Sequence, residues 1–213
     1  MNYYIPQWEE RTSYGFRRID PSAKLFEERI IYLGTPISDD VANAVIAQLM
    51  CLETMNPDTD ISIYINSPGG SFTALTAIYD TMRFIKPDVQ TVCLGQAASA
   101  AAILLGAGAK GKRMALPNSR ILIHQPYTEG TFGQTSDIEI QAQQSLHIKK
   151  VLLDLIAEHT GQSVEQVVAD ADRDRWFTAP QAVEYGLVDQ VITSAREAAD
   201  EGRPARTGST QKD

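Results

Sequence analysis

Cysteine and histidine are scarce in this chain, and basic residues are outnumbered by acidic ones. The 213 residues include 2 cysteines and 3 histidines, and no C-x-x-C or H-x-x-x-H spacing offers a metal site. Cys51 and Cys93 both lie among apolar residues, so we expect buried free thiols in a reducing compartment. The net charge of -8 argues against a nucleic-acid-binding protein, which would normally have a basic face.

Long apolar runs are missing as well. The first ten residues have neither a basic segment nor a long apolar one, so they are not a secretory signal. The longest uncharged stretch, 89–109, is interrupted by polar residues and glycines, whereas a membrane-spanning helix needs a predominantly apolar run. We therefore expect a cytoplasmic protein with no membrane partner.

The composition is otherwise that of an ordinary globular protein, with 43% hydrophobic and 22% charged residues. A chain of this length suits one domain with a full core, or one domain plus an appendage. Residues 1–25 mix aromatic and charged side chains without clear periodicity, which indicates an N-terminal arm. Residues 194–213 are polar and contain glycine and proline, so they predict a disordered tail. The domain itself is expected at 26–193.

Strand-like and helix-like segments alternate along this domain. Strands are expected at 29–34, 60–66 and 89–94, and the segments 38–55 and 75–85 have apolar residues at helical spacing. In 60–66, isoleucine alternates with other side chains, which is typical of a strand with one buried face. This alternation predicts an α/β fold with a mainly parallel sheet. Functional loops should gather at the carboxyl ends of its strands.

A long helix is predicted for about 136–160, from a capping box at Ser136 to a stop near Gly161. At ~1.5 Å per residue it would be about 37 Å long, which is more than a small domain needs to cover its sheet. Its apolar positions therefore indicate a second subunit as partner. A hairpin-like excursion is expected before it, at 127–134, and capping boxes at 163–166 and 178–181 predict two shorter helices.

Ser99 is the most informative residue, because it lies where the apolar strand 89–94 turns into an alanine-rich helix. A serine there can present its hydroxyl beside the free N–H groups of a helix N-terminus, which suit a developing oxyanion. His124 closes an apolar strand, and Asp174 lies in a charged run. Singly, these residues suit a helix cap, a structural histidine and a surface charge. Together they have the residue types of a catalytic triad, although without a G-x-S-x-G motif.

Gly69 and Gly70 follow the strand 60–66 and should reach the same sheet edge as Ser99. Glycines there let backbone N–H groups approach a ligand closely. The N–H groups of Gly70 and Ala100 are expected to converge on one oxygen, as acyl transfer requires. His124 would then take the serine proton and return it to the leaving amine, while Asp174 holds the imidazole tautomer.

Longer motifs make the chain recognisable: it resembles ClpP, the family of proteolytic subunits of the bacterial Clp protease, over about 24–192. The motifs that carry the resemblance are 64–70 (YINSPGG), 78–82, 95–99 (GQAAS), 111–113, 116–119, 123–126 (IHQP), 137–139, 172–175 (DRDR) and 182–189 (AVEYGLVD). The resemblance implies the ClpP/crotonase-like α/β fold of repeated strand–helix units with a long handle helix. It also implies a serine endopeptidase that needs no cofactor, with Ser99, His124 and Asp174 as its triad.

The family also implies partners. Two seven-membered rings, of one or two kinds of subunit, stack into a chamber, and a hexameric AAA+ unfoldase feeds unfolded proteins into it. Substrate would pair as an added strand, held by Gly69, Ser71, Phe72, Gln125, Pro126 and Tyr127. The docking pockets for the unfoldase map onto Tyr64, Phe84, Leu94, Met114 and Ile192, for which a plain core role is the alternative. Asp172 and Arg173 look like the charged pair that bridges rings.

The sequence departs from the common family pattern in three places. Ala100 stands where many relatives have methionine, and the segment after His124 is one residue longer. The aromatic N-terminal arm resembles those of actinobacterial paralogues, which often pair two different rings. Two other functions are therefore weighed: a ring subunit that mainly docks the unfoldase while a partner ring cleaves, and a crotonase-like acyl-CoA enzyme. The second has no need of the Ser99, His124 and Asp174 set.

Overall fold

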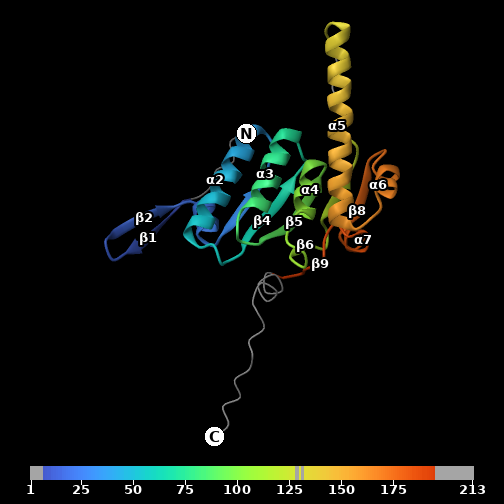
Figure 1. The fold of residues 1–213 in the computed structure, drawn as a ribbon. Helices are drawn as coiled ribbons and strands as arrows, with labels where there is room; N and C mark the ends of the chain where they lie inside the picture. Colours follow the sequence, from blue (N-terminus) through green and yellow to red (C-terminus); the bar gives the residue numbers. More distant parts are fainter. Residues whose placement is uncertain (1–6, 128–129, 131, 195–213) are drawn as a thin grey trace.

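Strands and helices alternate along the chain, and seven of the strands form a sheet at the centre of the molecule (Figure 1). The computed structural model describes residues 7–127, 130 and 132–194. The strands of the sheet are β3 (Ile30–Leu33), β4 (Ile61–Ser67), β5 (Val89–Ala98), β6 (Arg113–Ala115), β7 (Arg120–Ile123), β8 (Arg175–Thr178) and β9 (Gln190–Val191).

β5 organises this sheet. It pairs with β4 on one side, and with β6 and then β7 on the other, all in parallel. The sheet continues from β4 to β3 and from β6 to β9 in the same sense, and the β7–β8 pair alone is antiparallel. The predicted α/β fold with a mainly parallel sheet is therefore confirmed.

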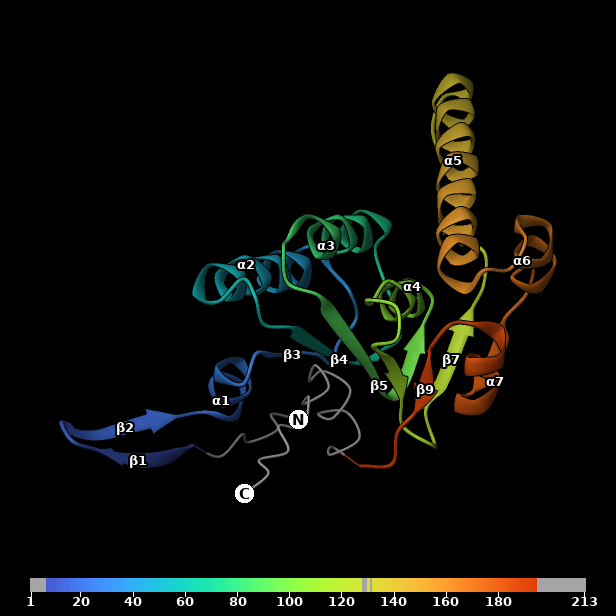
Figure 2. The same cartoon turned by 60° about the horizontal axis from the view of Figure 1, so that its bottom comes forward.

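Seven helices accompany the sheet in the described part of the chain. They are α1 (Pro21–Glu27), α2 (Asp39–Met55), α3 (Phe72–Phe84), α4 (Ala100–Gly106), α5 (Thr135–Thr160), α6 (Val164–Asp170) and α7 (Ala179–Tyr185). Figure 2 shows α2, α3 and α4 side by side on one face of the sheet. The predicted alternation in β4 is confirmed, because its isoleucines are buried against this layer.

α5 projects from the body as the long helix that the sequence predicts (Figure 1). Its 26 residues give a length of about 39 Å. Only Leu153, Ile156 and Ala157 near its end are buried, and Gly161 terminates it in the left-handed conformation with φ 74°. The predicted capping box at Ser136 is wrong, because the helix starts one residue earlier and no side chain caps it. The cap at Ser163 and the capping box at Thr178 are confirmed.

The described residues of the N-terminal arm form a small sheet of their own. Within the predicted arm, β1 (Trp8–Thr12) and β2 (Gly15–Ile19) form an antiparallel hairpin that extends away from the sheet (Figure 2). The predicted tail lies outside the described residues except for Ser194, and the predicted hairpin at 127–134 falls partly outside them. The described residues of that stretch form no strand. No helix in the described ranges is long and apolar enough to cross a membrane.

One burial prediction is wrong. Both cysteines are free, but Cys51 is exposed and only Cys93 is buried. The buried positions of α2 include Val45, Leu49 and Leu52, and Cys51 points about 120° away from that stripe at 3.6 residues per turn. Burial raises the pKa of the Cys93 thiol to about 11, so this thiol stays protonated.

Candidate active site

Ser99 occupies the sharp turn between β5 and α4. Its backbone has φ 57° and ψ -122°, a conformation that costs a non-glycine residue energy and is concentrated at functional sites. The turn is held by the Ser99 N–H, which donates to Leu122 O at 2.9 Å. The Ser99 side chain makes no capping hydrogen bond. The helix-cap interpretation therefore fails, and the hydroxyl is left for another role.

Gly69 makes this turn possible, because the loop after β4 lies directly against it. A Cβ at Gly69 would lie 2.5 Å from Ala98 O and 2.8 Å from Ser99 Cβ. Both distances are shorter than real Cβ contacts, and the φ of Gly69 is 91°. Position 69 therefore needs glycine for two reasons, the close approach and the backbone angle.

The backbone N–H of Gly70 points away from the neighbouring segment that contains Ile37. Gly70 forms a parallel bridge with Ile37, in which Gly69 O accepts from the Ile37 N–H at 2.9 Å and the Ser71 N–H donates to Ile37 O at 2.8 Å. Since the flanking residues make both bonds, the N–H of Gly70 points to the opposite side. The Ala100 N–H is the first of α4, so it has no partner within the helix.

A cavity of about 880 Å³ joins these groups. Ser99, His124, Gly70 and Ala100 all line it. So do most of the residues predicted to hold substrate, namely Ser71, Phe72, Gln125, Pro126 and Tyr127. The remaining one, Gly69, lies buried beneath the Ser99 turn. The structure thus brings the predicted nucleophile, base and N–H donors to one site.

The sequence analysis missed the second wall of this cavity, which α5 supplies. Leu146, Lys149, Leu152 and Ile156 line it, and Lys149 Nζ donates to Gln125 Oε1 at 2.7 Å. These positions recur at helical spacing, and that spacing was the available signal. The sequence analysis assigns the apolar face of this helix to a partner subunit, whereas part of this face lines the cavity.

Asp174 lies beside the cavity without lining it. The β7–β8 ladder pairs Ile123 with Arg175, so His124 and Asp174 would form the next antiparallel pair. The chains separate at that point, because the Gln125 N–H donates to Ala171 O at 2.7 Å. Asp174 is exposed, and no side-chain hydrogen bond joins Ser99, His124 and Asp174 within the described residues.

The two residues before Asp174 are also open to solvent. The Arg173 and Asp172 side chains are 92% and 64% exposed, and Arg173 Nε lies 3.8 Å from Asp172 Oδ2. Such an exposed pair adds little to the stability of the chain. Its charges are therefore available to another surface.

The predicted docking residues divide into two groups. Met114 and Ile192 are buried together with Val92, and half-buried Tyr64, Leu94 and Leu116 pack against them. This cluster lies on the sheet face opposite the main core, as the alternation in β4 requires. Val92 and Leu116 were not predicted, although each lies two residues from a predicted member. Phe84 ends α3 away from this cluster and is 78% exposed.

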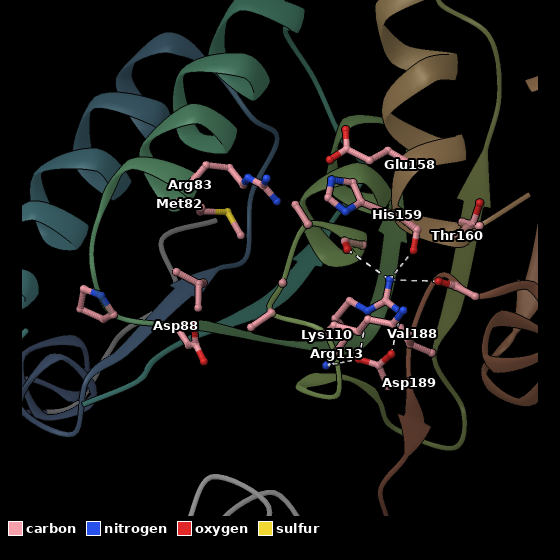
Figure 3. Close-up of a pocket in the computed structure, with 18 of the residues that line it drawn as sticks. Met82, Arg83, Asp88, Lys110, Arg113, Glu158, His159, Thr160, Val188 and Asp189 are labelled. Carbon is pink, nitrogen blue, oxygen red and sulfur yellow. Dashed lines mark hydrogen bonds and ion pairs between the residues drawn. The ribbon is translucent and has the colours of Figure 1, made fainter. Parts of the chain in front are cut away.

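A second cavity, of about 760 Å³, contains none of the predicted site residues (Figure 3). Arg113 crosses it and bonds Asp189 at 2.6 and 3.0 Å. The same guanidinium donates to the carbonyls of Gly106, His159 and Gly186. Burial raises the pKa of Asp189, but the bonds from Arg113 outweigh it and hold the pKa below its usual range. This network joins four elements and has a structural role.

No group of three His, Cys, Asp or Glu side chains is placed to hold a metal ion in the described ranges. The first cavity brings together a hydroxyl, an imidazole and two backbone N–H groups. These groups suit nucleophilic acyl transfer, because the hydroxyl attacks, the imidazole moves the proton and the N–H groups stabilise the oxyanion.

Comparisons with known proteins agree with this chemistry. A family model described as Clp protease matches residues 13–195. The "ATP-dependent Clp protease proteolytic subunit 1" of Cutibacterium acnes is 63% identical over 194 residues, which cover 91% of this chain and 90% of the relative. "Subunit 2" of Streptomyces coelicolor is 61% identical over 91% of this chain and 89% of its own, and "subunit 1" of Corynebacterium glutamicum is 61% identical over 89% and 91%. The chain belongs to the Clp protease family and is one of its serine peptidase subunits.

Proposed function

We propose that Ser99 is the nucleophile of a serine endopeptidase, with His124 as its base and Asp174 as the residue that orients His124. The observation that carries this proposal is the Ser99 turn. Its strained backbone aims an uncapped hydroxyl into the cavity that also contains His124, Gly70 and Ala100. A helix cap would need none of this strain.

In the proposed reaction, Ser99 Oγ attacks the carbonyl carbon of a peptide bond while His124 accepts its proton. The N–H groups of Gly70 and Ala100 bind the oxyanion. His124 then protonates the leaving amine, which leaves an acyl ester on Ser99. A water molecule hydrolyses this ester with His124 again as base. No step requires a cofactor.

We expect the substrate to bind as an added β-strand between two chain segments that flank Ser99. On one side, the N–H of Gly70 points away from Ile37 and is available to a new partner. On the other side, residues 124–127 leave the β7–β8 ladder and border the cavity. Main-chain hydrogen bonds would then set the substrate register, so that cleavage depends little on sequence.

The proposed assembly is a barrel of two stacked seven-membered rings, served by a hexameric AAA+ unfoldase that delivers unfolded proteins. Support comes from the relatives, whose names describe proteolytic subunits of an ATP-dependent protease. The exposed outer half of α5 supports it too, because Ile138, Ile140 and Leu146 are exposed in the single chain. Free cysteines suit the reducing cytoplasm in which we place this assembly.

A second candidate function is a ring subunit that mainly docks the unfoldase and activates a partner ring. Two observations favour it. Asp174 does not bond His124 in the single chain, and the relatives carry different subunit numbers. In that case the triad would close only in a mixed assembly.

Labelling with a fluorophosphonate separates the two functions. The purified protein is treated alone and after mixing with a second proteolytic subunit from the same source, and the intact mass and labelled peptide are determined. We expect an adduct on Ser99 in both samples. Labelling only in the mixture would favour the second function, and an adduct on another serine would refute the assignment of Ser99.

A further inference from the structure

Arg175 is the first residue of β8, and it directly follows Asp174. Its guanidinium forms an ion pair with Asp170. The same group stacks over two aromatic rings, with Cζ 4.9 Å from the centre of Phe177 and 5.1 Å from that of Tyr185. Three fixed partners thus hold one side chain at the start of the strand.

These partners are themselves held in place. Asp170 is 12% exposed in its side chain, and its Oδ2 accepts from the Tyr185 hydroxyl at 2.9 Å. The rings of Phe177 and Tyr185 lie 4.8 Å apart. Burial raises the pKa of Asp170, but the hydrogen bonds it accepts and the charge of Arg175 hold it below the usual range. The Asp170 carboxylate therefore stays ionised and remains paired with Arg175.

The anchored residue directly next to Asp174 lies on its C-terminal side. On its C-terminal side, Arg175 is clamped and also paired with Ile123 in the β7–β8 ladder. On its N-terminal side, the adjacent Arg173 is exposed and contacts the exposed carboxylate of Asp172 at 3.8 Å. The nearest anchor on this side is one residue further away, where Asp172 O accepts from Gln125 Nε2 at 2.9 Å. Arg175 is therefore the anchor nearest to Asp174, and it sets the direction in which Asp174 leaves the strand.

We propose that Arg175 is a positioning residue, whose clamp on Asp170, Phe177 and Tyr185 holds Asp174 at the end of the β7–β8 ladder, next to His124. This inference rests on the proposed role of Asp174 in the triad. Arginine suits the task because its planar guanidinium pairs with a carboxylate and stacks on aromatic rings at the same time. A lysine would keep the positive charge but would lack the planar guanidinium that stacks on the two rings.

The test compares variants of Arg175 with a matched control. Arg120 lies at the other end of the same strand pair and stacks over Trp176 at 5.1 Å. The measured quantity is the second-order rate of Ser99 phosphonylation by a fluorophosphonate, on rings whose assembly is checked by sedimentation. A displacement on the order of 1 Å costs about 100-fold in rate, so Arg175→Gln and Arg175→Lys should lose roughly 10- to 100-fold. Arg120→Gln should react at the normal rate.

A double-variant comparison separates positioning from a general structural effect. In the Asp174→Asn background, Arg175→Gln should cause no further loss, because Arg175 acts through Asp174. For a peptide substrate, Arg175→Gln should lower kcat and leave KM unchanged. An equal loss in both backgrounds, or full activity of Arg175→Lys, would overturn the inference. If Asp174→Asn alone reacted normally, the proposed triad would fail, and that outcome is distinct from the other two.

Discussion

At the scale of single residues, the site depends on a backbone turn more than on hydrogen bonds between side chains. Ser99 has a positive φ, which few residues other than glycine adopt without cost. Gly69 lies against that turn, and Gly70 and Ala100 contribute only N–H groups. Of these four residues, Gly69 and Gly70 can adopt their places only because they have no side chain.

Gly69→Ala should lower the rate of Ser99 phosphonylation by a fluorophosphonate by more than about tenfold, because the added Cβ would displace the turn. The matched control is Gly111→Ala. Gly111 has a similar φ of 85°, but its Cβ would meet nothing within 4 Å. The control should cost about 1–2 kcal/mol of stability, because alanine is strained at positive φ, and should leave the rate of phosphonylation unchanged. Equal rates in the two variants, measured with a fluorophosphonate, would mean that contact with Ser99 is unimportant.

At the scale of elements, the buried Arg113 connects the sheet to the helices around the second cavity. It begins β6, pairs with Asp189 just before β9, and bonds carbonyls at the ends of α4, α5 and α7. Tyr79 on α3 adds a hydrogen bond between its hydroxyl and His159 Nε2, 2.9 Å long. Burial lowers the pKa of His159, which favours the neutral ring at this contact.

Arg113→Met should destabilise the fold by about 3–5 kcal/mol, because it leaves the Asp189 carboxylate half-buried without its partner. Lys112→Met is the matched control, since Lys112 pairs with Asp60 and Asp88 nearer the surface and should cost about 1 kcal/mol or less. Urea unfolding followed by circular dichroism gives both values. Similar losses of stability in the two variants would show that burial does not make the Arg113–Asp189 pair more stabilising than the Lys112 pairs.

The same ion pair predicts a pH dependence. The pKa of Asp189 is lower in the folded chain than its usual value, so the unfolded chain binds more protons at acidic pH. The stabilisation is then fully present above about pH 4 and is lost as the pH falls through the lower folded pKa. Asp189→Asn should reduce the difference between the free energies of unfolding at pH 7 and at acidic pH, both measured by urea unfolding. An unchanged difference would rule out this carboxyl as its source.

At the scale of the whole molecule, the single chain has surfaces that suit an assembly. The outer half of α5 exposes apolar residues, and the segment with Asp172 and Arg173 lies next to the candidate triad residue Asp174. Ring contacts and triad geometry should therefore be coupled. The half-buried Tyr64 lies on another face, over the small cluster around Met114.

Arg173→Ala should shift the sedimenting species from double rings toward single rings and lower peptidase activity in the same proportion. The reason is that the exposed Arg173 is separated from Asp174 by one peptide bond, so a partner that binds it also orders Asp174. Sedimentation velocity and peptide hydrolysis are measured on the same samples. Full activity in isolated single rings would contradict this coupling.

Tyr64→Ala should weaken ATP-dependent protein degradation more than cleavage of small peptides, because docking is needed only for proteins. Tyr32 offers a control, since it pairs with Tyr64 in the β3–β4 register, is 53% exposed and lies outside the apolar cluster. Tyr32→Ala should leave both activities unchanged. An equal loss of both activities in Tyr64→Ala would argue against a docking role.

The sequence by itself determined the α/β alternation, the buried face of β4, the long helix, the family and the candidate residues Ser99, His124 and Asp174. Periodicity and turn chemistry are local properties, so they can be recognised along the chain. Tertiary structure alone decided that Gly69 packs on Ser99, that α5 walls the cavity, that Cys51 is exposed and that Asp174 stays outside the cavity. The physical reason is that a pattern tells which face of an element is apolar, whereas the segment that covers this face comes from a distant part of the chain or from another subunit.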